Sequence, residues 1–224
     1  MATDKQAALS ALYRGARERL SELVLAHPEA DRDRVPATPG WCVHDVVAHL
    51  TGVAEDLTDG WRPTGGPTED WTAGHVSRGR DVPTAELLVR WADRGPAVEE
   101  ILDATPTWPI VLDVGAHEHD VRGALGDTGA RDSDLVTIGA KILLKGLQVP
   151  HLLVVKTENL RLELGPSTVE DEPVTLTTTA FEVFRWRLGR RSRRQLKAMD
   201  WSGDPAPFLE HLCVFGPADS DVLE

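Results

Sequence analysis

The chain has 224 residues, of which 41% are hydrophobic and 27% charged, and its formal net charge is −12. These values are typical of a globular protein and exclude a wholly disordered chain. The negative charge argues against general nucleic-acid binding, the apolar runs are too short to cross a bilayer, and two cysteines cannot build a disulfide framework. The opening residues Met1–Gln6 lack the apolar stretch of a secretory signal, which predicts a cytoplasmic location.

Helical patterns dominate the first 150 residues. Apolar residues recur at helical spacing in five windows, 9–24, 46–57, 88–102, 110–125 and 135–142. A break at Pro36–Gly40 separates the first two windows, and Gly126 ends the fourth. Residues 60–82, rich in Gly, Pro, Asp and Thr, are predicted to form a long loop, and such loops in compact domains are often functional.

The pattern changes period after residue 150. Residues 160–164 and 174–179 alternate between apolar and polar side chains, as half-buried strands do, and residues 181–188 and 207–212 are expected to be helical. The sequence therefore predicts an α+β chain. A helical bundle over residues 1–150 is followed by a small α+β domain over residues 151–224.

Three potential metal ligands fall on the inward faces of two predicted helices. His49 lies between Val46 and Val53 in the second helix, while Asp113 and His117 are four residues apart in the fourth and share a face. Two imidazoles and one carboxylate inside a bundle suit a divalent transition metal such as zinc. Each residue also has an ordinary structural interpretation: a hydrogen-bonded core histidine, an acid favoured by a helix N-terminus, and an i, i+4 ion pair.

Two further carboxylates have helical spacing from these histidines. Asp45 precedes His49 by four residues and could hold its second ring nitrogen, although capping of the second helix is the expected role. Asp120 follows His117 by three residues and could hold that imidazole in the same way.

The remaining histidines and a nearby cysteine give weaker signals. His44 and His119 lie off the inward faces and are expected to be solvated, and His75 falls in the predicted loop, where its role is open. Cys42 precedes the second helix, whose N-terminus could activate a thiol, but a small buried residue is the expected role.

Basic residues are concentrated in one part of the C-terminal domain. Seven of them lie between Arg185 and Lys197. Such a run usually forms a solvated helix face or a surface patch. The alternative is recognition of an anion, because the guanidinium fork matches a carboxylate.

Several segments resemble the mycothiol-dependent maleylpyruvate isomerase family. The segment 39–50 contains Trp41, Asp45 and His49 at intervals of four and is similar to the second-helix motif of that family. Residues 113–120 are similar to its Glu-x-x-x-His-x-x-Asp segment, and residues 188–192 and 201–205 resemble its small C-terminal domain. The resemblance covers nearly the whole chain.

The resemblance implies a DinB-like four-helix bundle that binds a divalent metal, zinc being expected, through His49, Asp113 and His117. Asp113 departs from the family's usual Glu and is one methylene shorter. Arg190 best matches a C-terminal arginine implicated in the family's activity. The implied function is isomerisation of, or S-transfer to, a small electrophilic substrate with mycothiol as cosubstrate. The alternative is a non-catalytic metal- or ligand-binding protein of the same fold.

Overall fold

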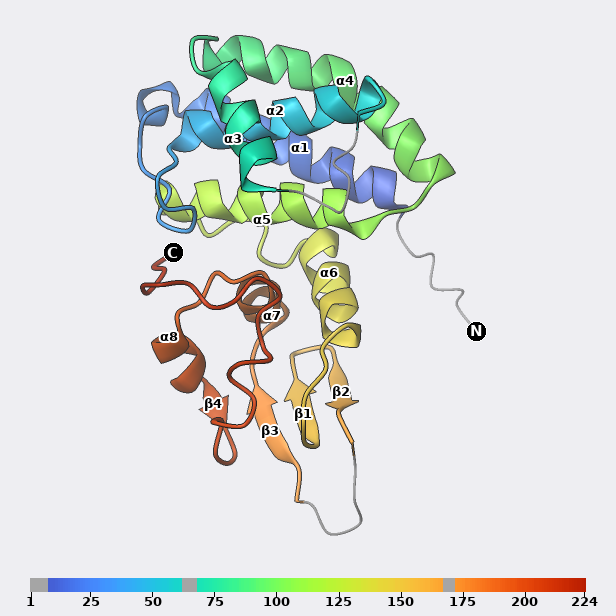
Figure 1. Cartoon of the computed structure of the whole chain (residues 1–224), viewed down its shortest axis with the longest axis vertical. Helices are drawn as coiled ribbons and strands as arrows, with labels where there is room; N and C mark the ends of the chain where they lie inside the picture. The colour runs from blue at the N-terminus through green and yellow to red at the C-terminus, as the bar shows by residue number, and fades with distance from the viewer. Residues whose placement is uncertain (1–7, 62–67, 167–171) are drawn as a thin grey trace. The chain divides into compact units, whose positions relative to one another are not determined.

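The computed structural model describes residues 8–61, 68–166 and 172–224 (Figure 1). The chain forms two compact units: residues up to Thr128 together with Glu224, and residues 129–223. The sequence expectation about Met1–Gln6 and part of the predicted long loop, residues 62–67, lie outside the described residues.

The first unit is a helical bundle. Its elements are α1 (Leu9–Ala26), a 3-10 turn (Pro28–Ala30), α2 (Val43–Thr58), α3 (Glu69–Gly79), α4 (Thr84–Ala104) and α5 (Trp108–Ala124). Helix α1 packs against α4 and α5, and α2 packs against α3, α4 and α5. The apolar stripes meet in a core whose most buried members include Ala16, Leu20, Val46, Trp91, Val98 and Val111. The four long helices of this bundle are those that the sequence predicts.

Helix α3 corrects the prediction of a loop over residues 60–82. Thr68 caps the helix by accepting a hydrogen bond from the Trp71 backbone N–H at 3.2 Å. Glu69 and Asp70 occupy the first turn, where the helix dipole favours acids. The buried face of α3 carries His75 instead of aliphatic side chains, so its apolar periodicity gives no signal.

Two glycines allow α3 to lie very close to α2. A Cβ atom at Gly52 of α2 would come within 2.5 Å of the His75 ring, and one at Gly79 of α3 would come equally close to the Ala48 Cβ. Any larger residue at either position would therefore force the two helices apart or displace the facing side chain.

In the described residues of the second unit, the chain forms a four-stranded sheet and three helices. Its elements are α6 (Asp134–Lys145), β1 (Leu153–Lys156), β2 (Arg161–Leu164), β3 (Val174–Thr177), α7 (Ala180–Arg187), α8 (Arg193–Lys197) and β4 (Asp200–Trp201). The strand order is β2-β1-β3-β4, with β1 and β3 parallel and the other two pairs antiparallel. Helix α6 packs against α7 and belongs to this unit, although the sequence analysis groups its residues with the bundle. The predicted α+β class is confirmed.

Two parts of the second unit differ from the sequence expectation. Residues 207–212 form turns instead of a helix. Strand β1 lies in the apolar run Leu153–Val155, all of whose residues are buried, so it lacks the alternation that identifies half-buried strands. Among the described residues, none of the helices has the length and apolarity that a bilayer span requires.

Candidate metal centre

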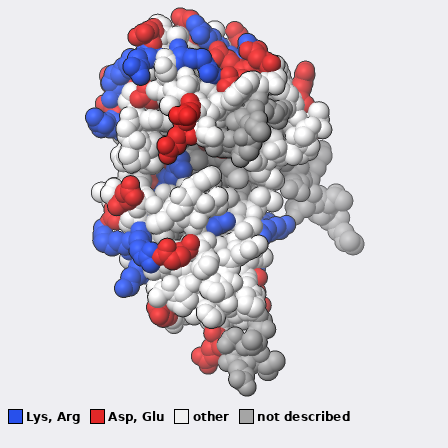
Figure 2. Space-filling model, in the orientation of Figure 1, with Lys and Arg blue, Asp and Glu red and all other residues white. Residues whose placement is uncertain are grey.

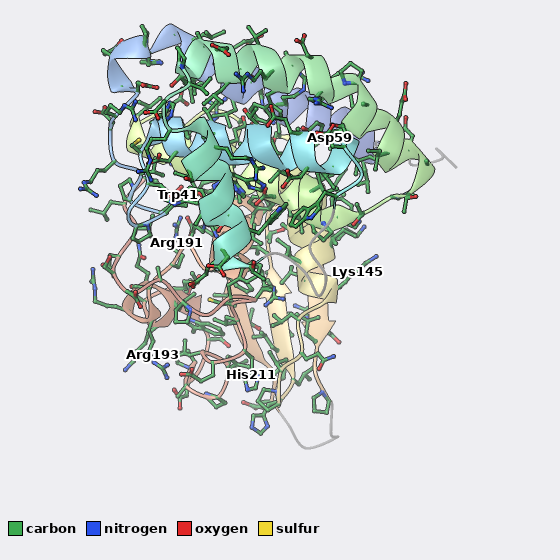
Figure 3. The ribbon with its side chains drawn as sticks, turned by 45° about the horizontal axis from the view of Figure 1, so that its top comes forward. Trp41, Asp59, Lys145, Arg191, Arg193 and His211 are labelled. Atoms are coloured by element: carbon green, nitrogen blue, oxygen red, sulfur yellow. The ribbon has the colours of Figure 1, made fainter. Side chains whose placement is uncertain are left out.

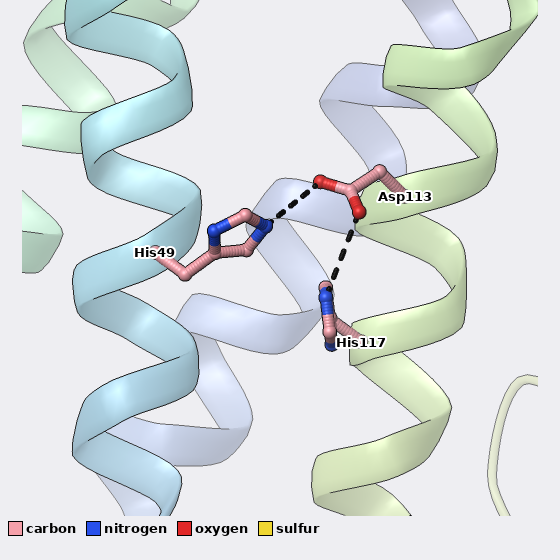
Figure 4. Close-up of side chains that lie close together, drawn as sticks. All are labelled: His49, Asp113 and His117. Atoms are coloured by element: carbon pink, nitrogen blue, oxygen red, sulfur yellow. Dashed lines mark ion pairs between the residues drawn. The ribbon is translucent and has the colours of Figure 1, made fainter. Parts of the chain in front are cut away.

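His49 of α2 and Asp113 and His117 of α5 come together inside the helical unit (Figure 4). The His49 Nε2 atom lies 3.4 Å from Asp113 Oδ2, and the His117 Nε2 atom lies 3.6 Å from Asp113 Oδ1. One potential ligand atom from each residue lies within 4.8 Å of the other two. The histidine side chains are 3% and 7% exposed, whereas that of Asp113 is 34% exposed. Solvent therefore reaches the cluster at the carboxylate.

The two separations between a histidine nitrogen and the Asp113 carboxylate fit ligands that share one ion. Direct N–H···O hydrogen bonds are about 2.7–3.2 Å long, shorter than both distances here. Ligand atoms at about 2.0–2.2 Å from a tetrahedral zinc ion lie about 3.4 Å from one another. The donor set of two imidazole nitrogens and a carboxylate is also one that zinc and similar ions accept. The three residues thus have the donor chemistry of a divalent metal site, and each histidine nitrogen has a suitable separation from the carboxylate.

Asp120 lies beside the imidazole of His117. The His117 Nδ1 atom lies 3.0 Å from Asp120 Oδ2, and the Asp120 side chain is fully buried. This contact is a close approach of charge and not a hydrogen bond, because His117 Nδ1 has no hydrogen-bond partner among the described residues. The spacing of Asp120 and His117 therefore places the carboxylate next to the ring without fixing the tautomer of His117.

The second imidazole nitrogen of His49 contacts another histidine. The His49 Nδ1 atom lies 3.1 Å from His75 Nδ1, and His75 Nε2 lies 2.9 Å from Asp56 Oδ2. Asp56 also accepts hydrogen bonds from the Trp71 indole at 2.7 Å and from the Arg78 guanidinium at 2.8 Å. A chain of hydrogen bonds therefore runs from the candidate ligand His49 to a carboxylate on the same helix.

Burial and hydrogen bonding act against each other on the pKa of both His75 and Asp56, and the pKa of each group is lowered on balance. Burial lowers the pKa of His75, against the raising effect of its bond to Asp56. Burial alone would raise the pKa of Asp56, but hydrogen bonds from His75 and Trp71 and the charge of Arg78 together lower it. The pair is therefore a neutral imidazole beside an ionised carboxylate.

Neither residue of this pair is predicted from the sequence to belong to the site. His75 lies on the unpredicted helix α3, and Asp56 lies on α2 two turns after His49, on the same face. The available signal was the cap: Thr68 followed by Glu69 and Asp70 is a typical helix start, and a helix beginning there carries His75.

The indole rings of Trp41 and Trp71 lie beside the imidazoles, and a third indole stacks on Trp71. The Trp41 ring lies 5.2 Å from that of His49, between centroids, and stacks on His117 at 5.8 Å. Trp71 contacts His49 edge-on at 6.4 Å and itself stacks with the half-exposed Trp61 at 5.8 Å. Trp41 is labelled in Figure 3, before the start of α2. These rings limit water around the imidazoles and offer apolar contact area to a ligand.

The prediction that His44 and His119 are solvated is wrong, because both are buried. His44 Nδ1 lies 2.7 Å from the Thr84 hydroxyl, and its Nε2 lies 3.2 Å from the Gly79 carbonyl oxygen. Helix α2 is covered by α3 as well as by α4, so a residue off its main apolar stripe is still enclosed. His44 connects these helices and lies outside the candidate ligand cluster.

Asp45 caps α2, as the sequence predicts. Its Oδ2 atom accepts hydrogen bonds from the Cys42 backbone N–H at 2.9 Å and from the Cys42 thiol at 3.1 Å. Burial raises the pKa of that thiol. Because burial raises its pKa, the Cys42 thiol stays protonated, and the N-terminus of α2 does not activate it.

The basic segment between Arg185 and Lys197 is only partly solvated. Arg185, Arg187 and Arg191 are buried, which corrects the interpretation of the whole run as a solvent-exposed face. The Arg191 fork binds Glu182 with two hydrogen bonds of 2.8 and 2.6 Å. These buried guanidinium groups contribute to the packing of the second unit.

The exposed part of this segment lies on α8 and beside it. Arg193 and Arg194 form ion pairs with Glu210 and Asp221, and Figure 2 shows blue and red side chains adjacent on this part of the second unit. Arg193 is labelled in Figure 3. Arg190, half-buried, follows α7 and donates a hydrogen bond to the Leu188 carbonyl oxygen at 2.7 Å.

Comparison with known proteins identifies the family. Two solved structures share the fold, one of mycothiol-dependent maleylpyruvate isomerase and one of a histidine-to-alanine mutant of it, with 15% and 12% sequence identity and TM-scores of 0.52 and 0.53. Each alignment covers 81% of this chain and 88% of the other. No curated protein matches. Residues 13–132, more than half of the chain, match the family model described as the mycothiol maleylpyruvate isomerase N-terminal domain. The chain therefore belongs to the mycothiol maleylpyruvate isomerase family.

Proposed function

We propose that this protein is a metal-dependent enzyme that uses a low-molecular-weight thiol, mycothiol. The enzyme either isomerises a small electrophilic substrate or joins the thiol to it through the sulfur atom (S-transfer). The observation that carries this proposal is the convergence of His49, Asp113 and His117, with both Nε2 atoms directed at one carboxylate. Family membership supplies the thiol and the class of reaction.

The three residues would hold a divalent ion, zinc being the best match to two imidazoles and a carboxylate. When bound, such an ion supplies Lewis acidity that lowers the pKa of a coordinated thiol. Three protein ligands leave a coordination position for an exogenous group. Asp113 is the exposed member of the set, so we expect the thiol to enter on its side.

The substrate chemistry follows from thiolate addition to a double bond conjugated with a carbonyl group. A carbon–sulfur bond forms at the β-carbon while the π electrons move to the carbonyl oxygen, and the former double bond becomes free to rotate. Expulsion of the thiolate then restores the double bond as the trans isomer. Protonation of the adduct in place of expulsion gives the S-transfer product. The indoles of Trp41 and Trp71 would limit competing water near the addition site.

A substrate or cosubstrate carboxylate needs a cationic partner, and we assign that role to Arg190. A guanidinium fork binds a carboxylate through two charge-assisted hydrogen bonds. The family resemblance selects Arg190 from the basic segment, and the residue is half-buried.

Metal analysis of purified protein, followed by thiol-dependent activity on a panel of electrophiles, tests this proposal. We expect one divalent ion per chain, sharply reduced metal content in His49→Ala and unchanged content in a matched control, His151→Ala, which alters an exposed histidine of the second unit. Full stoichiometric metal in His49→Ala would show that the ligand set is wrong.

A non-catalytic metal- or ligand-binding protein is the second candidate, and one observation favours it: Asp113 stands where the family usually has Glu. Cobalt substitution distinguishes the two candidates. If added thiol changes the visible spectrum of the cobalt protein, the thiol binds the metal as the enzyme proposal requires. A spectrum that no thiol perturbs, together with absent turnover, would favour the binding protein.

A further inference from the structure

The hydrogen-bond chain from His49 to Asp56 has a definite proton arrangement. The Asp56 carboxylate only accepts, so the His75 Nε2 atom, 2.9 Å away, carries a proton. The two Nδ1 atoms of His75 and His49 are 3.1 Å apart, so one of them must donate to the other. The question is which imidazole carries that second proton.

The charges around the hydrogen-bond chain decide which imidazole carries the second proton. Asp56 carries one negative charge, which already pairs with the Arg78 guanidinium at 2.8 Å. A proton on both nitrogens of His75 would add a second positive charge to a side chain that is fully buried. His75 is therefore neutral with its proton on Nε2, its Nδ1 atom accepts, and His49 donates from Nδ1.

We infer that His75 and Asp56 are positioning residues that hold His49 in its Nδ1–H tautomer, with the Nε2 lone pair facing Asp113. This inference rests on the proposed metal site and assigns roles to two residues outside the ligand set.

Several contacts fix this chain in place. Asp56 accepts from the Trp71 indole at 2.7 Å, and the Trp71 ring meets His75 edge-on with centroids 4.4 Å apart. On the other side, the backbone of Gly52 lies against the His75 ring with no room for a Cβ atom. His75 is thus held between α2 and the ring of Trp71, and its hydrogen bonds have little freedom to change partners.

Nitrogen-detected NMR of the metal-free protein tests the tautomers directly. At about pH 8.5, where ordinary imidazoles are neutral, we expect His49 to carry its proton on Nδ1 and His75 to carry its proton on Nε2. Free histidine in water favours the opposite tautomer, so the result for His49 would report its surroundings. A proton on Nε2 of His49 would overturn the inference.

Two substitutions at His75 separate its hydrogen bonding from its packing. His75→Leu removes the acceptor, so His49 should populate both tautomers and the affinity for Zn²⁺ should fall about 10- to 100-fold, as for other residues that support metal ligands. His75→Asn keeps an acceptor oxygen near the position of Nδ1 and should restore the Nδ1–H tautomer and much of the affinity. An unchanged tautomer and unchanged affinity in His75→Leu would contradict the proposed role.

His44→Leu is the matched control, because His44 is another buried, hydrogen-bonded histidine of α2 that lies outside the chain. It should lower stability without altering the tautomer of His49 or the Zn²⁺ affinity. An equal loss of affinity in His44→Leu would mean that the His75 effect is general destabilisation. If the protein binds no metal but His49 has the expected tautomer and responds to His75→Leu, the proposed function fails and the positioning role stands.

Discussion

Replacing Gly52 by alanine should destabilise the bundle, although the same change inside most helices is favourable. An alanine in place of a helix-interior glycine normally stabilises by about 0.5–1 kcal/mol. At Gly52 the new Cβ atom would lie 2.5 Å from the His75 ring and within 3 Å of its Cβ atom as well. Relief of such overpacking costs about 1–3 kcal/mol.

Gly74→Ala is the matched control on α3. The added Cβ atom there meets only the tip of Arg78, at 3.8 Å, so the ordinary gain of about 0.5–1 kcal/mol should appear. The free energies of unfolding of the two variants should therefore differ by about 1–3 kcal/mol, the overpacking cost. Urea denaturation followed by far-ultraviolet circular dichroism measures this difference.

Gly52→Ala should also weaken metal binding at the candidate site. In this variant His75 must move away from residue 52 and lose its short contact with His49. We expect reduced Zn²⁺ affinity in Gly52→Ala and parental affinity in Gly74→Ala, measured by competition with a chromogenic chelator. Equal stability of the two variants, or a Gly52→Ala protein more stable than the parent, would refute the close packing of His75 on α2.

Substitutions at three further residues test the site and the core. Asp113→Glu should keep metal binding, whereas Asp113→Ala should weaken it. Metal titration measures both affinities, and equal affinity in Asp113→Ala and the parent would exclude Asp113 as a ligand. Arg190→Ala should reduce thiol-dependent activity about 10- to 150-fold with metal content intact, and Arg190→Lys should recover part of it; unchanged kcat/KM in Arg190→Ala would remove its proposed role. Burial raises the pKa of Tyr13 to about 12, so its neutral form stabilises the fold fully below pH 10 and progressively less toward pH 12. Tyr13→Phe should flatten the dependence of the unfolding free energy on pH between about pH 10 and pH 12. An unchanged slope in this variant would contradict the role of Tyr13.

The sequence predicts the helical unit well because its long helices carry strong apolar stripes. Val46 and Val53 on α2 are both buried, as their spacing requires. Helix α3 escapes prediction because its buried contacts are an imidazole and a glycine backbone, neither of which contributes to hydrophobic periodicity. In the second unit, β1 escapes because all of Leu153–Val155 is buried and no alternation remains.

The candidate ligands could be selected from the sequence because helical spacing alone places them. His49 has an apolar residue one turn away on each side, and the interval between Asp113 and His117 is one turn of one helix. The partners of His49 could not be selected in this way. The contact of His75 with His49 depends on how α3 packs across α2, which is a tertiary feature that spacing within a single helix does not report.

The candidate ligands come from two helices that are far apart in the sequence, one residue from α2 and two from α5. An ion bound to all three would therefore act as a cross-link between the two helices, and its binding free energy would add to that of folding. At a free ion concentration 100 times the dissociation constant, this linkage is worth about 2.7 kcal/mol. The melting temperature of the protein would then depend on the free metal concentration. A chelator would lower the stability of the bundle even when no substrate or thiol is present.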